Sequence, residues 1–232
     1  MGLSLQLAKP SALTDWVYTT VKEAILSLMF PMGAQLHIDE LCEKLGTSRT
    51  PIREALLRLE KDGLVRAVPR VGYFVTLVTR RDLKELFEIR QMLEGHAVAT
   101  AAPHLTASDL DHLEQVLADS ASALEAADTT RFLRLEIEFH TYLMNHAPNR
   151  HLSLVMESLR DLTYRERVLA MQSADNLRHT FVEHGRVLDC LRERDGKTAG
   201  ELMSKHIGDA LARMLQFLDL AEGDNGPNKT EE

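Results

Sequence analysis

Cysteine is nearly missing from this 232-residue sequence, which contains only Cys42 and Cys190. The two lie far apart and show no spacing typical of a metal site, so neither a disulfide framework nor a thiolate zinc site is indicated. We therefore expect both to be buried, reduced thiols of a cytosolic protein.

Long apolar segments are missing as well. No run approaches the ~20 residues that a membrane-spanning helix needs. The first residues, MGLSLQLAKPSALTDW, lack the basic region followed by an apolar region that marks a secretory signal. These absences predict a cytoplasmic protein without a membrane partner. A content of 44% hydrophobic and 27% charged residues is typical of a folded, soluble chain.

An overall positive charge, which many nucleic-acid-binding proteins carry, is also lacking, because the formal net charge is −8. The distribution of charge is uneven, however. Between Gly46 and Arg70 there are six basic and three acidic residues. Such a local basic patch can still bind phosphate, since salt screens distant charges beyond about 8 Å.

The texture of the chain changes once, between residues 76 and 80. We expect a flexible N-terminus (1–12), a DNA-binding domain (13–78), a helical effector-binding and dimerisation domain (79–222) and a flexible tail (223–232). Hydrophobic periodicity in the first domain predicts three helices and then a β-hairpin. Their expected bounds are 16–28, 38–45 and 49–61 for the helices, and 64–68 and 73–77 for the strands.

That order of elements is typical of a winged helix-turn-helix. Beyond it, long helical patterns with few breakers predict six helices, at about 79–102, 106–127, 129–146, 149–171, 174–195 and 197–221. Thr79 with Asp82, and Thr106 with Asp109, are expected to cap two of them. The predicted fold class is therefore mainly α, with an N-terminal winged helix-turn-helix and a C-terminal antiparallel six-helix bundle.

The third predicted helix carries the features of a DNA-recognition helix. Ser48 stands where it can cap the helix, and Arg49 and Arg53 lie four residues apart on one face with Thr50 beside them. Arginines at this position can bind guanine edges or phosphates. At the hairpin tip, Arg70 beside Gly72 suits a phosphate or minor-groove contact. The alternative is a small helical domain whose arginines form a solvated face.

Three histidines interrupt apolar helix faces in the second domain. His184 and His206 do so on the last two helices, and His140 lies one turn after Glu136 on an earlier one. Core-facing polar groups need partners, and three imidazoles with one carboxylate from three helices form a sensible ligand set for a divalent metal. The alternative is that a backbone group or another neighbour satisfies each histidine separately.

The stretch from Leu36 to Val75, above all LCEKLGTSRTPIREALLRLEKDGLVRAVPRVGYFV, resembles the GntR family of bacterial transcriptional regulators. The helical remainder resembles the FadR-like branch with an FCD effector domain, and six rather than seven helices point to the VanR-type subgroup. The resemblance implies a homodimer, a repressor in our interpretation, that binds a near-palindromic double-stranded DNA operator. One departure is Asp39-Glu40, where some relatives carry a DNA-contacting arginine.

The same resemblance bears on the metal set. Metal-binding FCD domains carry an Asp-x-x-x-His helix and single histidines on the last two helices, which His140, His184 and His206 match. Glu136 replaces the aspartate here, and the metal is expected to be Zn, Ni or Mn. Arg90 has two interpretations: an ion pair with Glu94, four residues on, or a clamp for the carboxylate of a small organic acid effector.

Two other functions remain open at this point. The cluster of Glu136 and the three histidines could activate a water molecule in a metalloenzyme, although no separate general base has a motif. The metal could also be purely structural, with the bundle acting only as a dimerisation module. Our leading hypothesis is a metabolite-responsive regulator rather than an enzyme.

Overall fold

The computed structural model describes residues 12–170 and 174–224. These residues divide into two compact units, the first ending at Val78 and the second beginning at Thr79. The two ends predicted to be flexible lie mostly outside the described residues. The exceptions are Ala12, which begins a helix, and residues 223–224, which extend the last helix past its predicted end.

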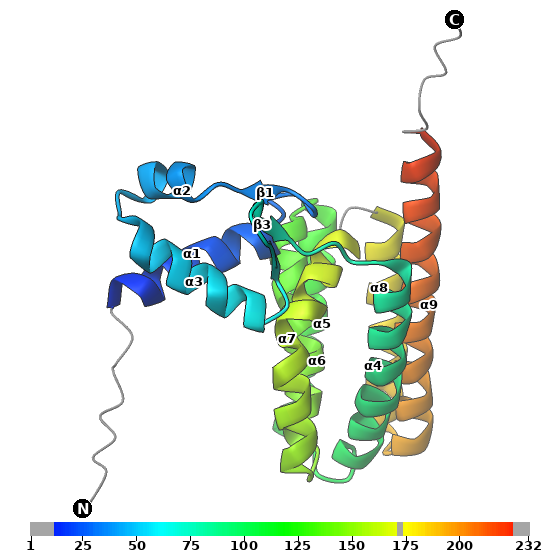
Figure 1. The fold of residues 1–232 in the computed structure, drawn as a ribbon. Coiled ribbons are helices and arrows are strands. Elements are labelled where there is room, and N and C mark those ends of the chain that lie inside the picture. The colour runs from blue at the N-terminus through cyan, green and yellow to red at the C-terminus, as the bar shows by residue number, and fades with distance from the viewer. Residues whose placement is uncertain (1–11, 171–173, 225–232) are drawn as a thin grey trace, which may run out of the picture. The chain divides into compact units, whose positions relative to one another are not determined.

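The first unit contains three helices and a small sheet among its described residues (Figure 1). Its elements are α1 (Ala12–Leu26), β1 (Gln35–Leu36), α2 (Ile38–Leu45), α3 (Arg49–Lys61), β2 (Val65–Val68) and β3 (Gly72–Val75). The bounds of α2 and α3 match the predicted ones. The first helix starts earlier and ends earlier than expected, with Leu28 beyond its end at a φ of 60°.

The wing has one strand more than the predicted hairpin. In the sheet β3 lies between β1 and β2, with Gln35 opposite Phe74 and Val65 opposite Val75. A two-residue strand such as β1 is too short to show the alternation by which strands are identified from sequence. The core beneath is formed by the apolar stripes of α1 and α3, which include Val17, Val21, Ile25, Ile52, Ala55, Leu56 and Leu59.

The described residues of the second unit form the six helices that the sequence predicts. They are α4 (Arg80–Ala101), α5 (Ala107–Glu125), α6 (Thr129–His146), α7 (Arg150–Ala170), α8 (Ala174–Arg192) and α9 (Gly196–Asp224). Thr79 with Asp82 and Thr106 with Asp109 form complete capping boxes at the starts of α4 and α5, as expected. None of the described helices combines the length and the apolarity that crossing a membrane requires.

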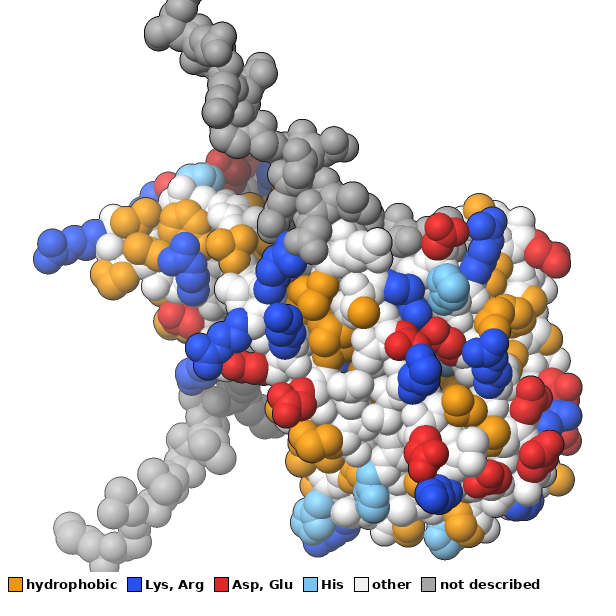
Figure 2. Space-filling model, turned by 90° about the vertical axis from the view of Figure 1, so that its right-hand side faces the viewer, with side chains coloured by type: hydrophobic (Ala, Val, Ile, Leu, Met, Phe, Trp, Pro, Cys, Tyr) orange, Lys and Arg blue, Asp and Glu red, His pale blue; other side chains and the backbone are white. Residues whose placement is uncertain are grey.

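Helices α4 and α9 pack along their length (Figure 1), and glycines set how closely they approach. A Cβ built on Gly200 would lie 2.5 Å from the carbonyl oxygen of Gly95, so only glycine fits there. Both cysteines are free and half-buried rather than fully buried as predicted. Figure 2 shows acidic and basic side chains next to one another on the larger, right-hand part of the surface.

The centre of the helical unit is polar, which is unusual for a bundle core. Several fully or nearly fully buried side chains there are ionisable: Arg90, Glu94, Glu136, His140, Arg165, Glu166, His184 and His206. Burying such groups is costly unless they pair with one another or bind an ion. This cluster is therefore the part of the unit that needs a functional explanation.

Candidate functional site

Helix α3 buries one face and exposes the other. Ile52 and Leu56 are fully buried, whereas Arg49, Thr50 and Arg53 are exposed. Ser48 occupies the N-cap position with extended backbone, but its side chain makes no capping hydrogen bond, so the expected cap is absent in this form. The hydroxyl and the first backbone N–H groups of α3 are therefore available to an anion such as a phosphate.

The two arginines of this face differ in their contacts. Arg49 donates to Asp39 on α2 through Nε at 2.8 Å and a terminal nitrogen at 2.9 Å, with both side chains largely exposed. Arg53 makes no ion pair with any residue that the structure describes. Asp39 thus orients Arg49 and neutralises part of its charge.

The other basic residues of this unit have distinct positions. Arg58 donates to Asp15 at 2.6 Å and covers the ring of Tyr18, so it is held against α1. Arg70 is exposed at the hairpin tip with a φ of 64°. Gly72 has a φ of 139°, and a Cβ there would lie 3.1 Å from the side-chain amide of Gln35.

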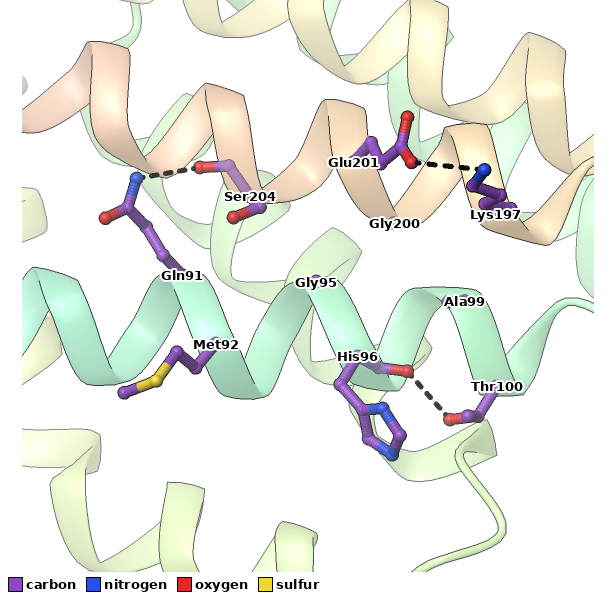
Figure 3. A pocket seen from close by; sticks show the side chains of 10 residues that line it. All are labelled: Gln91, Met92, Gly95, His96, Ala99, Thr100, Lys197, Gly200, Glu201 and Ser204. Atoms are coloured by element: carbon purple, nitrogen blue, oxygen red, sulfur yellow. Dashed lines mark hydrogen bonds and ion pairs between the residues drawn. The ribbon is translucent and has the colours of Figure 1, made fainter.

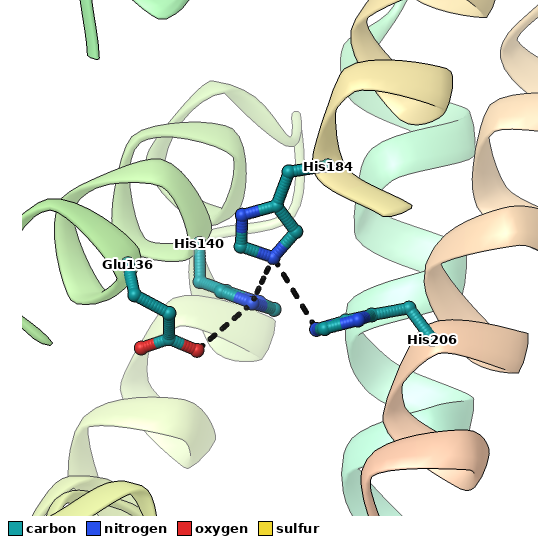
Figure 4. A group of neighbouring side chains, drawn as sticks. All are labelled: Glu136, His140, His184 and His206. Atoms are coloured by element: carbon teal, nitrogen blue, oxygen red, sulfur yellow. Dashed lines mark hydrogen bonds and ion pairs between the residues drawn. The ribbon is translucent and has the colours of Figure 1, made fainter. Parts of the chain in front are cut away.

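The four residues predicted as metal ligands meet in the bundle interior (Figure 4). Glu136 and His140 come from α6, His184 from α8 and His206 from α9; all are buried, and one donor atom of each lies within 4.8 Å of the others. We call this group the tetrad. The structure brings together all four predicted residues, and the three helices that supply them are separate segments of the chain.

The distances within the tetrad suit a metal. The Nε2 atom of His184 lies 3.1 Å from Nε2 of His140 and 3.3 Å from Nε2 of His206, and Oε1 of Glu136 lies 3.2 Å from Nε2 of His140. Metal–nitrogen bonds of about 2.1 Å place neighbouring donor atoms about 3.0–3.4 Å apart in octahedral or tetrahedral geometry. The donor set therefore fits a single divalent cation.

Carboxylates hold two of the imidazoles from behind. Nδ1 of His140 lies 2.5 Å from Oε2 of Glu94, and Nδ1 of His206 lies 2.6 Å from Oε2 of Glu183. Burial would raise the pKa of Glu94, but Arg90 and His140 outweigh it and hold that pKa well below its usual value. An ionised carboxylate accepts, so Nδ1 of each neutral imidazole donates and Nε2 carries the lone pair.

This arrangement leaves lone pairs facing one another. His184 can donate a proton from Nε2 to one neighbouring imidazole at most, because only one hydrogen is available. At least one pair of nitrogens at 3.1 or 3.3 Å is then repulsive in the neutral state. Burial, followed by the neighbouring histidines, lowers the pKa of His184 well below its usual value, so a proton is a poor bridging cation here. A metal ion removes the conflict.

Arginines balance the buried carboxylates. Arg90 donates from Nε to Oε1 of Glu94 at 2.7 Å, which is the ion pair considered from the sequence. Nε of Arg167 lies 3.0 Å from Oε2 of Glu136, and this contact is an ion pair without hydrogen-bond geometry. Burial would raise the pKa of Glu136, but Arg167 and His140 lower it to about 2.

A small cavity of about 20 Å³ adjoins the tetrad. Its lining includes Arg90, Glu136, Glu166, Arg167 and His206. A space of this size holds one water molecule or one ligand oxygen. Among the residues of this wall, Oε2 of Glu166 makes no hydrogen bond within the described structure, and Oε2 of Glu136 lies against Arg167.

A larger groove of about 530 Å³ lies between α4 and α9, with Gly95 facing Gly200 at its floor (Figure 3). Gln91 spans it and donates to the carbonyl oxygen of Ser204 at 3.2 Å. The one cation among its lining residues, Lys197, is exposed and lies 3.9 Å from Glu201. The groove therefore offers little to hold a carboxylate.

Several residues around the tetrad escaped the sequence reasoning. Glu183 and Arg213 behind His206, and Arg167 beside Glu136, have no local motif. Glu94 was considered only as a partner of Arg90. Its spacing from Arg90 was the one available signal, since residues four apart share a helix face.

Comparisons with known proteins agree with the two-unit organisation. The model of the "Bacterial regulatory proteins, gntR family" matches residues 13–75, and the model of the FCD domain matches residues 85–209. The HTH-type transcriptional regulator YdhC of Bacillus subtilis is 30% identical over 92% of this chain and 96% of its own length. The HTH-type transcriptional repressor RspR of Escherichia coli is 25% identical over 94% and 95%. The solved structure of E. coli McbR/YncC superposes with a TM-score of 0.73 at 26% identity, covering 89% of this chain and 99% of that one.

Proposed function

Because the chain belongs to the GntR family of DNA-binding transcriptional regulators and carries an FCD domain, we propose that it is a metal-containing repressor controlled by a small organic acid. It acts as a homodimer on a near-palindromic operator, since a two-fold protein matches a two-fold site. The repressor role is supported by the name of one relative, the repressor RspR. The six helices of the second unit favour the VanR-type subgroup.

The tetrad is the observation that carries this proposal. Three imidazole nitrogens and one carboxylate oxygen suit Zn, Ni or Mn, and the facing lone pairs of His140, His184 and His206 favour a bound cation. Three nitrogens and one oxygen leave coordination positions open in octahedral geometry. An acid effector can supply the remaining oxygens.

The charges around the tetrad favour an anion. The nearby carboxylates and guanidinium groups are equal in number: Glu94, Glu136, Glu166 and Glu183 against Arg90, Arg165, Arg167 and Arg213. A divalent metal therefore adds a charge of about +2 that the protein leaves uncompensated, and a buried charge needs a partner. A bound carboxylate supplies it, with one oxygen in the adjoining cavity near Arg90 and Arg167.

Arg90 fits both of its interpretations. Its Nε atom is committed to Glu94, but the side chain also lines the cavity. The terminal nitrogens of a guanidinium group can bind a carboxylate while Nε holds another partner. We propose that Arg90 contacts the effector in this way, with Arg167 as a second cation.

The DNA contacts are assigned to the first unit. We propose that Arg49, Thr50 and Arg53 read base edges, that Ser48 binds a phosphate at the start of α3, and that Arg70 with Gly72 contacts the phosphate backbone or minor groove. The exposure of the α3 residues and of Arg70 supports this assignment.

A purely structural metal is the main alternative. Arg90 and Arg167, which line a cavity next to the tetrad, favour a ligand-binding role. A metalloenzyme is disfavoured because the matching family and the relatives are transcriptional regulators.

The test uses an operator selected from random DNA duplexes by the full-length, metal-loaded protein. Operator affinity is then measured at fixed salt with a panel of small mono- and dicarboxylates. We expect at least one acid to change the affinity by about 5- to 150-fold, the usual range of allosteric coupling. If no acid changes operator affinity or the melting temperature, the sensing role is wrong and the structural metal replaces it.

A further inference from the structure

We propose that Glu94 and Glu183 are the positioning residues of the metal centre, which fix the tautomers of His140 and His206 and set the affinity for the metal. The inference rests on the proposed metal site and goes beyond its ligands. Each carboxylate stands between a ligand histidine and an arginine. Two histidine–glutamate–arginine groups, built from different helices, therefore flank the tetrad.

The histidine–glutamate–arginine group around His140 joins α6 to α4. Oε2 of Glu94 lies 2.5 Å from Nδ1 of His140, and Oε1 accepts from Nε of Arg90 at 2.7 Å. Both Glu94 and Arg90 are almost fully buried, with exposed side-chain fractions of 1% and 4%. Glu94 thus gives one oxygen to each of these two hydrogen bonds, with Arg167 3.9 Å from Oε2, and water has little access to compete.

The histidine–glutamate–arginine group around His206 joins α9 to α8. Oε2 of Glu183 lies 2.6 Å from Nδ1 of His206, and Arg213 donates to both oxygens of Glu183, at 2.9 and 3.0 Å. A two-pronged guanidinium contact holds the carboxylate in one plane. Arg213 also donates from Nε to Asn176 at 2.6 Å, and Asn176 lines the cavity beside the tetrad.

The third imidazole is placed by a different device. His184 stacks on Phe139 with ring centroids 4.3 Å apart and an angle of 10°. Packing sets the plane of that ring, whereas hydrogen bonds set the planes of the other two. The contrast shows what the carboxylates add, because stacking fixes the plane of a ring but not which of its two nitrogens carries the proton.

The tautomer matters because only a deprotonated nitrogen binds a metal. With Nδ1–H donating to a carboxylate, the lone pair of His140 or His206 lies on Nε2, which faces the tetrad (Figure 4). The negative charge of the carboxylate on the other side of the ring also makes Nε2 more basic and therefore a stronger metal ligand. Loss of such an outer partner lowers metal affinity by about 10- to 100-fold.

Glu183 is the better residue to test, because it is partly exposed and its replacement is less of a threat to folding. Zinc affinity of the full-length, untagged protein is measured by competition with a chelator for wild type, Glu183→Ala and Glu183→Gln. The control is Glu201→Ala, an exposed glutamate on α9 whose loss changes the net charge equally. Nitrogen-15 NMR of the imidazoles reports which nitrogen of His206 carries the proton.

We expect Glu183→Ala to bind zinc about 10- to 100-fold more weakly than the Glu201→Ala control while still binding one equivalent at saturation. Glu183→Gln should recover part of the loss, because its amide oxygen still accepts from Nδ1. His206 should lose its single tautomer only in the alanine variant. Glu94→Gln should weaken zinc binding in the same direction.

A zinc affinity of Glu183→Ala within about twofold of the control, with an unchanged tautomer, overturns the positioning role and leaves the metal site standing. A wild type that binds neither zinc, nickel nor manganese more tightly than His184→Ala overturns the metal site and the positioning role together. The two failures are therefore distinguishable.

Discussion

Glu166 on α7 is the buried carboxyl group whose charge the protein stabilises least. It is 2% exposed, and its Oε2 atom has no hydrogen-bond partner among the described residues. Burial raises the pKa of Glu166 from 4.5 to about 7, and the opposing charges of Arg90, Arg165 and Arg167 only partly offset it. The folded protein therefore retains a proton that the unfolded chain releases.

The sign of the pH effect follows from this difference. A pKa that is raised in the folded state contributes stability that is fully present below the unfolded pKa of 4.5 and is lost as pH rises to about 7. Each pH unit in that window corresponds to about 1.4 kcal/mol, so the total loss is roughly 3 kcal/mol. Glu166→Gln removes the ionisation and should remove the loss.

The measurement is urea unfolding of wild type and Glu166→Gln at several pH values from 5 to 8, followed by circular dichroism with chelator present. We expect the variant to gain about 3 kcal/mol relative to wild type between pH 5 and pH 8. Comparing the two proteins cancels the titration of the histidines and of Glu94. Glu157→Gln, at an exposed position on the same helix, should show no such change.

A difference between wild type and Glu166→Gln that stays constant from pH 5 to 8 would falsify this reasoning. It would mean that the arginines, rather than desolvation, determine the ionisation of Glu166. A variant that loses stability relative to wild type as pH rises would lead to the same conclusion, because an ion pair would then have been removed.

Three further predictions concern the DNA surface, the metal and the helix packing. Arg53→Ala should weaken operator binding by ~1–3 kcal/mol at fixed salt without lowering the melting temperature, as read by fluorescence anisotropy; unchanged affinity removes this arginine from the base contacts. Zinc at a hundred times its Kd should stabilise the wild type by about 2.7 kcal/mol and His184→Ala much less; equal melting curves with and without zinc, nickel or manganese contradict the metal site. Gly200→Ala should destabilise the protein by ~1–3 kcal/mol, because its Cβ would lie 2.5 Å from the Gly95 carbonyl oxygen; a gain in stability, the usual effect of alanine in a helix, contradicts the tight α4–α9 packing.

The order of the secondary structure could be predicted from the sequence because its signals are local. The apolar stripe of Ile52, Leu56 and Leu59 recurs at the helical period, so α3 was identified with its correct bounds. The pairs Thr79–Asp82 and Thr106–Asp109 lie three residues apart and form their capping boxes within one turn. Such patterns need no knowledge of the rest of the fold.

Local patterns failed where a partner came from elsewhere. Strand β1 exists only because β3 pairs with it, and two residues have no period of their own. Ser48 is a residue type that commonly caps helices, but its side chain makes no capping hydrogen bond. No local pattern around Arg49 indicates that Asp39, on the preceding helix, accepts two hydrogen bonds from it.

The proposed metal site also combines local signals with tertiary ones. Sequence alone identified Glu136, His140, His184 and His206, because a polar residue on an apolar helix face stands out within its own helix. Only the tertiary structure decided that the Nε2 atoms of the three histidines face one another and that Glu183 lies behind His206. These positions depend on how α6, α8 and α9 are placed and rotated. Packing between residues far apart in the sequence sets that placement, as the close approach of α4 and α9 at their glycines illustrates.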